Sequence, residues 1–501
     1  MSKPVSQIKY IQELLNKKEI SCEELTQKYI DVIEEYDGIL NSYVYKTSDI
    51  ALDTARKVDK RIKDGEELAP LEGIPMSLKD NISTKNINTT CCSKMLQNYK
   101  PIYDATVWEI IKNQNGILLG KNNMDEFAMG SSCETSIFGG ARNPHETSHV
   151  AGGSSGGGSS SVAGNLSVYS LGSDTGGSIR QPASFCGIVG LKPSYGTVSR
   201  FGLIAFASSF DQIGPITTSV EDAAIVFDAI SKYDKKDSTS VGNKGASTVK
   251  NLRNDIKGIK IGVAKEYLED IRDDVREKIE KSIEIYKSLG AEILDISLPM
   301  DKYSLAVYYI LACAEASSNL GRYDGIRYGY RTENYKNIDE MICKTRSEGF
   351  GLEVKHRILL GTYVLSSGYY DAYYKKAQKL RGAVVNAFKE AFSKCDVILT
   401  ATSPITSFKQ GYTSSKPIET YKSDLCTVPV NIAGLPAVSI PCGFNEEGLP
   451  VGLQLIGNRF EEAKILNIAY AFESVTRDTL FKSPDMGVKL NKRIIKLGEK
   501  D

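Results

Sequence analysis

Two segments rich in glycine and serine are placed to bring the backbone close to a substrate. They are 152–158, of sequence GGSSGGG, and 172–178, of sequence GSDTGGS. Glycine reaches dihedral angles that other residues avoid and leaves its N–H unobstructed, and consecutive N–H groups turned inward form a small anion-binding concavity. In the second segment the N–H groups of Thr175 to Ser178 could surround the oxyanion formed when the Ser178 hydroxyl attacks a carbonyl.

A serine nucleophile needs a base beside it. The chain contains only three histidines, which are His145, His149 and His356. Lysine is therefore the candidate base, and Lys79 follows directly on a strand expected at 74–78. If Lys79 is buried there, its amine is shifted toward the neutral form that accepts a proton. Ser154, in the first glycine segment, is placed to pass the proton from nucleophile to base.

Each of these features has a simpler interpretation. Glycine-serine loops are usually flexible turns, and a lysine at a strand end is usually solvated. A phosphate-binding loop of the GxxxxGK[ST] type is excluded, because no lysine follows 156–158. Residues 152–156 match the GxSxG nucleophile elbow, but 146–150 is too polar for the strand that should precede it. A catalytic thiol at Cys133 or Cys186 lacks a nearby histidine in sequence, so both are expected to be buried bystanders.

Composition restricts the class of protein. The 62 basic residues equal the 62 acidic ones, so the surplus typical of a chain that binds nucleic acid on its own is missing. The apolar runs are too short to span a bilayer, and the first residues lead into a polar helical pattern rather than a signal peptide. Ten cysteines without a CxxC pair fit free thiols in a reducing compartment. A cytoplasmic protein without membrane contact is expected.

Helical and extended patterns alternate along the chain and predict a layered α/β architecture. Helices are expected within 4–36, where Ser21 and Glu24 form a capping box, and over 48–63, 104–115, 273–289, most of 303–393 and 461–476. Strands are expected at 74–78, 117–119, 168–171, 259–263, 396–400, 437–441 and 451–456. We predict a single domain over 1–501, with a catalytic core at about 70–220 and a helical region for substrate or partner at about 300–393.

Taken together, these residues resemble the amidase signature family. The matching segments, in the order and spacing of that family, are 73–81, 152–158, 172–183, 190–194 and 211–215. The resemblance implies a mixed central sheet covered by helices on both faces, with Lys79 as base, Ser154 as relay serine and Ser178 as nucleophile. It also implies a cis peptide between Gly153 and Ser154. The oxyanion hole is assigned to N–H groups of Thr175, Gly176 and Gly177.

Within that family the chain is similar to the A subunits of bacterial-type tRNA-dependent amidotransferases. The stretches that carry this similarity are 124–132, 323–329 and 361–374. The resemblance implies a glutaminase that forms a glutamyl ester on Ser178 and delivers ammonia to a B subunit. That partner converts Glu-tRNA(Gln), Asp-tRNA(Asn) or both, holds the charged tRNA, and uses ATP and magnesium, while a small C subunit completes a heterotrimer. No metal or cofactor is implied in this chain.

Free glutamine carries an α-carboxylate and an α-ammonium, so a selective site needs a cation and an anion beside the amide. In the resembled subunits these contacts fall on positions that match Tyr309, Arg357 and Asp424. A guanidinium such as Arg357 can hold a carboxylate with two parallel hydrogen bonds, and Asp424 can hold the ammonium. From the sequence alone, each of the three could equally be an ordinary surface or ion-pair residue.

Small departures from the family pattern conserve size or flexibility. Residues 157–161 read GGSSS where GGSAAA is usual, Val150-Ala151 stands where Val-Pro is common, and Phe210 replaces a leucine. Two other functions stay open. One is a stand-alone amidase with the same three catalytic residues and another small amide as substrate. The other is a non-catalytic scaffold or tRNA-binding subunit, against which the neutral net charge and the intact catalytic residues count.

Overall fold

The computed structural model describes residues 6–243, 247–299, 301–412 and 421–485. These residues form one sheet of 11 strands in the order β1-β3-β2-β4-β6-β5-β10-β11-β9-β7-β8. The strands are β1 Tyr43–Lys46, β2 Pro75–Lys79, β3 Ile117–Asn122, β4 Tyr169–Asp174, β5 Val189–Lys192, β6 Gln212–Thr217, β7 Lys260–Ala264, β8 Glu292–Ile296, β9 Val397–Ala401, β10 Ala437–Phe444 and β11 Pro450–Gly457. Strand β2 runs parallel to β3 and β4, whereas β4, β6, β5, β10, β11 and β9 are antiparallel in succession. The predicted α/β class with a mixed sheet is confirmed.

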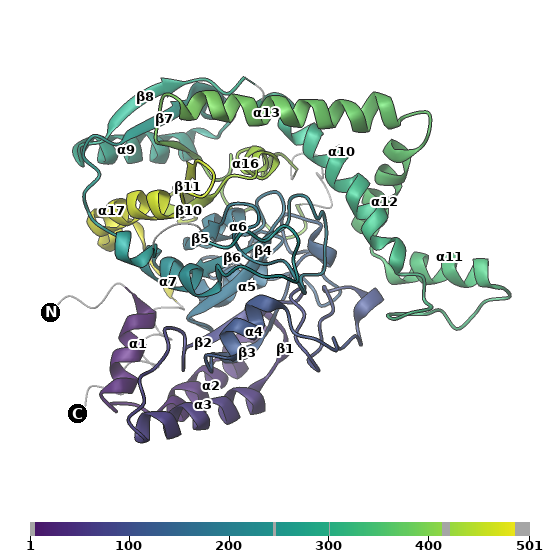
Figure 1. The fold of residues 1–501 in the computed structure, drawn as a ribbon, viewed down its shortest axis with the longest axis horizontal. Helices are drawn as coiled ribbons and strands as arrows, with labels where there is room; N and C mark the ends of the chain where they lie inside the picture. The colour runs from purple at the N-terminus through teal and green to yellow at the C-terminus, as the bar shows by residue number, and fades with distance from the viewer. Residues whose placement is uncertain (1–5, 244–246, 300, 413–420, 486–501) are drawn as a thin grey trace.

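Helices cover both faces of this sheet (Figure 1). On β11, Gly452 packs against Ser184 of α6, and Gly457 packs against Ile465 of α17. The two glycines are an odd number of residues apart, so they face opposite sides of the sheet. The α-helices that the structure describes are α1 Gln7–Asn16, α2 Cys22–Leu40, α3 Ser48–Lys63, α4 Thr106–Lys112, α5 Gly156–Ala163, α6 Arg180–Phe185, α7 Val220–Ile230, α8 Lys265–Glu269, α9 Asp273–Ser288, α10 Asp301–Asn319, α11 Ile338–Gly349, α12 Leu352–Leu365, α13 Lys376–Phe392, α16 Val428–Ala433 and α17 Glu462–Leu480.

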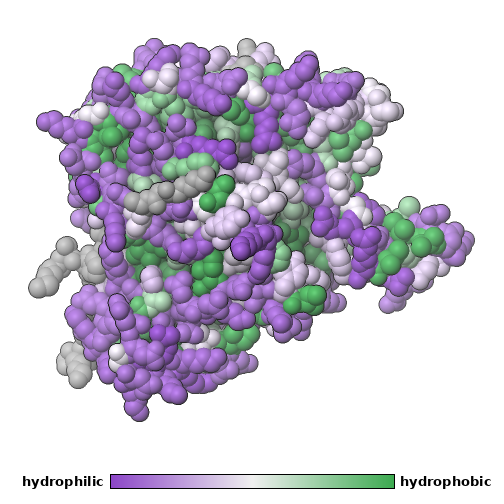
Figure 2. Space-filling view, in the orientation of Figure 1, coloured by the Kyte–Doolittle hydropathy of each residue, from purple (hydrophilic) through white to green (hydrophobic). Residues whose placement is uncertain are grey.

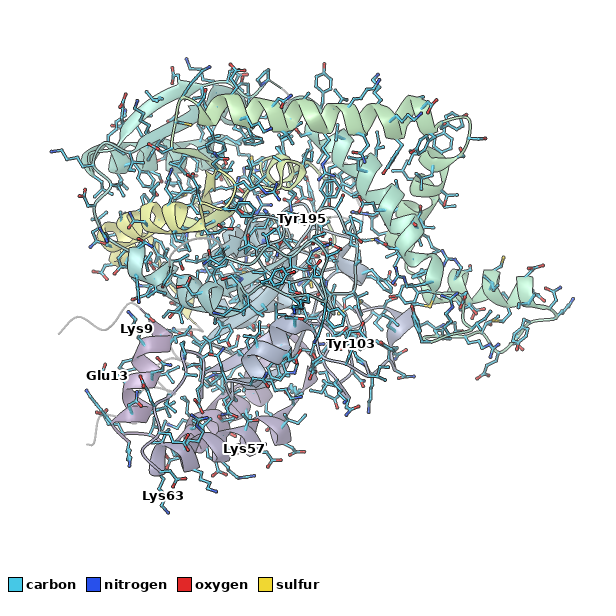
Figure 3. The ribbon with its side chains drawn as sticks, in the orientation of Figure 1. Lys9, Glu13, Lys57, Lys63, Tyr103 and Tyr195 are labelled. Carbon is cyan, nitrogen blue, oxygen red and sulfur yellow. The ribbon has the colours of Figure 1, made fainter. Side chains whose placement is uncertain are left out.

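The N-terminal helices follow the predicted pattern. At the start of α2 the Ser21 hydroxyl accepts the Glu24 N–H, and the Glu24 carboxylate accepts the Ser21 N–H, so the capping box is confirmed. Most apolar side chains of α1 and α3 face the core, while charged ones such as Lys9, Lys57 and Lys63 lie on the outside (Figure 3). Here helical periodicity and capping chemistry are enough to locate the elements.

Some strands do not show in the sequence pattern. Strands β5 and β6 were not expected, and both are completely buried. Their sequences, VGLK and QIGPIT, carry glycine or proline and do not alternate between apolar and polar residues. A strand that is covered on both faces has no solvent side to create that alternation, and proline and glycine weaken the signal further. Strands β1 and β8, at the two ends of the sheet, were also missed.

Helices α10, α12 and α13 form a frame at one side of the sheet, and α11 projects from it (Figure 1). The projecting part shows hydrophobic residues among hydrophilic ones on its surface (Figure 2), and Ile338 on α11 is 58% exposed. Because α10, α11, α12 and α13 make up most of 303–393, the mostly helical stretch expected there is confirmed. Among the described residues, no helix combines the length and the apolar character that crossing a membrane requires.

Candidate active site

Lys79 occupies the C-terminal end of β2, a strand buried along its whole length. Its Nζ lies 2.7 Å from Ser154 Oγ and 3.2 Å from the Ser173 carbonyl oxygen. Because β2 and β4 are parallel neighbours, Lys79 and the end of β4 at Asp174 meet at the same edge of the sheet. The second glycine segment begins on β4, so the sheet itself brings Lys79 to that segment.

Burial changes the protonation of Lys79. The side chain is almost inaccessible to solvent, and this desolvation lowers its pKa to about 8, although the carboxylates of Asp125 and Asp174 oppose the shift. An ordinary lysine has a pKa of about 10.4. A substantial fraction of Lys79 is therefore neutral near physiological pH and able to accept a proton from the Ser154 hydroxyl beside it.

The two glycine segments lie against each other. The Ser155 N–H donates to the Ser178 carbonyl oxygen at 3.1 Å, and the Ser155 hydroxyl donates to the Ser173 carbonyl oxygen at 3.2 Å. The Gly153–Ser154 peptide is cis, as the resemblance implied. Ser154 is fully buried, whereas Ser178 keeps 8% of its surface exposed. The structure thus joins Lys79 to Ser154 directly and places Ser178 in the adjoining loop, on the side that solvent reaches.

The residues assigned to the oxyanion hole differ in their contacts. The Gly177 N–H donates to Asp174 Oδ1 at 2.8 Å, so this amide is already engaged by a carboxylate, and its role as an oxyanion donor stays a prediction. Gly176 packs against the ring of Tyr308, and a Cβ built at Gly176 would lie 2.7 Å from its Cζ. The Thr175 hydroxyl donates to Asp211 at 2.6 Å. The oxyanion roles of Thr175 and Gly176 stay predictions.

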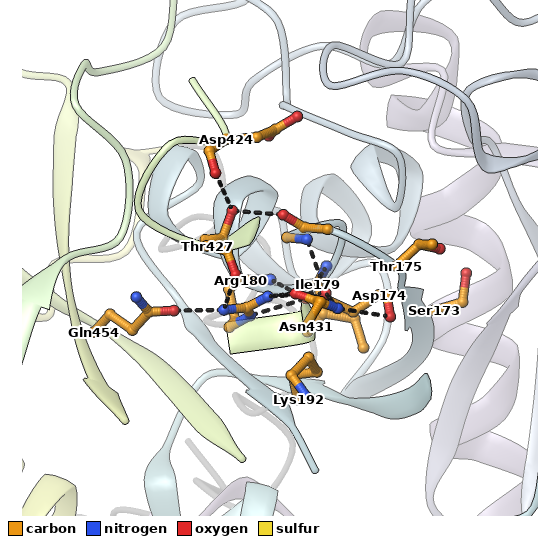
Figure 4. A network of polar contacts seen from close by, with 12 residues as sticks. Ser173, Asp174, Thr175, Ile179, Arg180, Lys192, Asp424, Thr427, Asn431 and Gln454 are labelled. Carbon is orange, nitrogen blue, oxygen red and sulfur yellow. Dashed lines mark hydrogen bonds and ion pairs between the residues drawn. The ribbon is translucent and has the colours of Figure 1, made fainter. Parts of the chain in front are cut away.

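A buried ion pair fixes the second glycine segment (Figure 4). Arg180 lies 3.0 Å from Asp174, and both side chains are inaccessible to solvent. Burial disfavours the charged form of Asp174, but the Arg180 guanidinium, helped by Lys192 and the Asn431 side chain, outweighs burial and lowers the carboxyl pKa to about 2. Arg180 also donates to Gln454 at 2.6 Å and to Asn431. Since Asp174 accepts the N–H groups on both sides of Ser178, at Gly177 and at Ile179, the pair holds the nucleophile loop in one shape.

The three residues assigned to substrate binding come from separate elements. Arg357 on α12 is buried, pairs with Glu353 at 2.8 Å, and lies over the ring of Tyr309 on α10 at 5.2 Å. The structure thus brings Tyr309 and Arg357 into contact. Asp424 accepts the Ser131 hydroxyl at 2.6 Å, and burial raises its carboxyl pKa to about 7. The binding roles of all three residues stay predictions.

The alternatives to a lysine-activated serine find little support. Cys133 and Cys186 are buried, and burial raises the pKa of both thiols well above its ordinary value, so neither favours the reactive thiolate. The His145 ring contacts the Cys186 carbonyl oxygen rather than its sulfur. Before Ser154, residues 146–150 form a turn and two isolated bridges instead of the strand that a nucleophile elbow requires.

A family model for amidases matches residues 24–466. The chain belongs to the amidase family. It is 56% identical over 464 residues to the A subunit of glutamyl-tRNA(Gln) amidotransferase from Caldanaerobacter subterraneus subsp. tengcongensis, covering 92% of this chain and 95% of that protein. The A subunit of the same enzyme from Thermoanaerobacter pseudethanolicus is 55% identical over 468 residues, covering 93% of this chain and 96% of that protein.

Solved structures of amidase-family members share the fold. The crystal structure of the glutamyl-tRNA(Gln) amidotransferase A subunit from Thermotoga maritima superposes with a TM-score of 0.79 at 39% identity, over 96% of this chain and 97% of that chain. The peptide amidase from Stenotrophomonas maltophilia superposes with a TM-score of 0.81 at 28% identity, over 97% of this chain and 99% of that chain. The predicted family and its mixed sheet with helices on both faces are therefore confirmed.

Several polar residues of this amidase site were not singled out in the sequence. Asp174 and Arg180 lie inside the motif 172–183. A fully buried arginine is rare and indicates a special role, but the burial of Arg180 is visible only in the structure. Glu353 precedes Arg357 by one helical turn, a spacing that indicates an ion pair on a helix. Tyr421, whose hydroxyl donates to Glu353 at 3.0 Å, had no signal in the sequence.

Proposed function

We propose that the chain is the glutaminase subunit of a tRNA-dependent amidotransferase, with Ser178 as nucleophile, Ser154 as relay and Lys79 as base. The observation that carries the chemistry is the 2.7 Å contact between Lys79 Nζ and Ser154 Oγ in a buried site. The substrate class is supported by the two amidotransferase A subunits described above, which are more than half identical to this chain over nearly their whole length.

The mechanism begins with neutral Lys79. Lys79 accepts the proton of Ser154, Ser154 accepts the proton of Ser178, and the Ser178 oxygen attacks the amide carbon of glutamine. The oxyanion is held by N–H groups of the loop from Thr175 to Ser178, of which Gly177 is already engaged by Asp174. The proton returns to the amide nitrogen, ammonia departs, and water then hydrolyses the glutamyl ester.

Glutamine would be held by its two charged α-groups. In this proposal Arg357 binds the α-carboxylate, and the Tyr309 ring beside it limits the space around the guanidinium. Asp424 binds the α-ammonium, and its buried position makes that contact strong because few waters screen it. The existing Arg357 pair with Glu353 keeps the guanidinium in place before substrate arrives.

We further propose that ammonia passes to a B subunit, and that a C subunit completes the heterotrimer. In the assembly, the B subunit would use ATP and magnesium to activate the charged tRNA, so this chain needs neither for its own step. The 62 basic and 62 acidic residues of the chain are consistent with tRNA binding mainly through the partner.

The decisive experiment separates glutamine hydrolysis from amide transfer. In the assembled complex, Ser178→Ala should abolish glutaminase activity and leave the tRNA-dependent reaction active when free ammonium is supplied. An electrophilic glutamine analogue should label Ser178 in the unaltered chain and fail to label the variant. Loss of both activities, in a variant that folds and assembles normally, would contradict the proposed role.

A stand-alone amidase is the second candidate, and the structural similarity to a peptide amidase favours it. An assay of the lone chain distinguishes the two functions. A glutaminase that feeds a partner is expected to be slow on its own and to accelerate when the partners are added. A free amidase would hydrolyse its amide at full rate without them.

A further inference from the structure

A chain of hydrogen bonds runs from Asp424 to the loop that carries Ser154. Asp424 Oδ2 accepts the Ser131 hydroxyl at 2.6 Å. The carbonyl oxygen of Ser131 accepts the side-chain N–H of Gln181 at 2.9 Å, and Gln181 Oε1 accepts the Gly153 N–H at 3.0 Å. Ser131 is 6% exposed and Gln181 is inaccessible, so water does not compete for these bonds.

The orientation of Gln181 is determined at both ends. An amide side chain has one donor end and one acceptor end. Its donor end faces a carbonyl and its acceptor end faces an N–H, so a flipped amide would lose both contacts. Gln181 also lies on α6, whose first residue is the second after Ser178. One side chain therefore contacts the Ser131 loop and the Ser154 loop from a helix attached to the nucleophile.

The loops that contain Ser131 and Gly153 are in direct contact. A Cβ at Gly152 would lie 2.5 Å from Gln181 Oε1, and a Cβ at Gly153 would lie 2.6 Å from the Ser132 nitrogen. The Cys133 N–H donates to Asp125, and the Asp125 N–H donates to the Ser154 carbonyl oxygen at 3.2 Å. Close packing transmits displacements rather than absorbing them, so a displacement of the backbone near Ser131 also displaces Ser154.

We propose that Ser131 and Gln181 are positioning residues that couple occupation of Asp424 by a substrate α-ammonium to the alignment of Ser154. The inference rests on the proposed glutaminase function. An ammonium bound to Asp424 fixes the carboxylate, which holds the Ser131 hydroxyl in a charge-assisted hydrogen bond. Ser131 in turn holds the Gln181 side chain, which fixes the position of the Gly153 N–H next to Ser154. A substrate without the ammonium leaves Asp424 and this chain of hydrogen bonds less restrained. Ser154 is then less well aligned, and the substrate reacts more slowly.

The test uses two substrates and the full chain, in the assembly in which it hydrolyses glutamine. The second substrate is glutaramate, which is glutamine without its α-amino group. For Ser131→Ala we expect kcat at saturating glutamine to fall by roughly tenfold, within the usual range of coupling between sites, and kcat for glutaramate to change by less than about twofold. Gln181→Met should act in the same direction, and the double variant should lose little more than Gln181→Met alone, because both changes break one path.

Ser407→Ala is the matched control. The Ser407 hydroxyl is also buried and donates to the Val150 carbonyl oxygen at 2.6 Å, outside the path. In this variant the ratio of kcat for glutamine to kcat for glutaramate should stay unchanged. Its midpoint of thermal unfolding should match that of Ser131→Ala.

Three results would overturn the coupling. They are a rise in KM for glutamine with kcat unchanged in Ser131→Ala, an equal loss on both substrates, or the same ratio change in Ser407→Ala. If the unaltered assembly hydrolyses glutaramate but not glutamine, the proposed function itself fails, together with this inference.

Discussion

The loops that carry Ser154 and Ser178 and the helices that carry Tyr309 and Arg357 are held in different ways. In the loops, backbone N–H groups bond to buried side chains: Asp174 alone accepts N–H groups on both sides of Ser178. On the helices, Arg357 is held by Glu353 one turn earlier and by aromatic rings, while the opposite side of α12 exposes Leu359 to the extent of 66%.

The difference predicts two kinds of defect. A change in the loops moves the reacting atoms, so it should lower kcat or destabilise the fold. A change on the helices removes a contact that substrate and transition state share, so it should raise KM. Single substitutions in each region distinguish the two kinds of defect.

Replacing Lys79 by methionine should give the largest effect. The variant removes the base while keeping a buried chain of similar length, so kcat should fall by about 10⁴-fold, comparable to the loss of a catalytic residue in other serine hydrolases. Steady-state glutaminase kinetics measure it. Lys57→Met, at an exposed lysine of α3, is the control and should leave kcat unchanged. A Lys79→Met variant that retained a tenth of the activity would remove Lys79 from the mechanism.

Replacing Arg180 by methionine should destabilise the protein more than it alters binding. The change leaves Asp174 as a buried carboxylate without its cation, which typically costs about 3–5 kcal/mol in the free energy of unfolding. Denaturant unfolding measures this value. Arg56→Met, which breaks exposed ion pairs with Glu23 and Asp53, should leave that free energy nearly unchanged. Equal losses in the free energy of unfolding for the two variants would show that the buried pair stabilises the fold no more than the exposed pairs do.

The rate should depend on pH through Lys79. Its pKa is about 8, and only the neutral amine accepts a proton, so activity is present above that pH and is lost as pH falls. Between pH 8 and pH 6, kcat/KM should fall by about 50-fold, roughly fivefold from pH 8 to pH 7 and nearly tenfold from pH 7 to pH 6. Protonation of Asp424, with its pKa of about 7, should steepen the decline below pH 7 for glutamine. A profile that is flat between pH 6 and pH 9 would contradict the assignment of Lys79 as base.

Replacing Arg357 by lysine should give the smallest effect. Lysine keeps the charge but loses the planar pair of donors, so KM for glutamine should rise by roughly tenfold, which corresponds to about 1.4 kcal/mol. At the same time kcat should stay within about twofold, because the reacting loops are untouched. Arg381→Lys, at a partly buried arginine that donates to Ser209, is the matched control for KM. A large fall in kcat for Arg357→Lys would break the division between loops and helices.

Much of the fold could be predicted from local sequence. Helix α3 begins and ends where its pattern does, and α2 starts at its capping box, because periodicity and capping depend on neighbouring residues alone. Strands β5 and β6 escaped prediction because they are covered on both faces and contain glycine or proline. Their position in the sheet depends on partners from distant parts of the chain, such as β10 beside β5.

For the site, the sequence by itself determined the chemical groups: a lysine after a strand, two serines in glycine segments, and hardly any histidine to compete with them. Only the tertiary structure decided their protonation and their hydrogen-bond partners. It buried Lys79 so that its pKa falls, and it directed the Gly177 N–H at Asp174. It also brought Asp424 to Ser131, which lies 293 positions earlier in the chain. Proton affinity and hydrogen-bond partners depend on what surrounds a group in space, and sequence spacing does not contain that information.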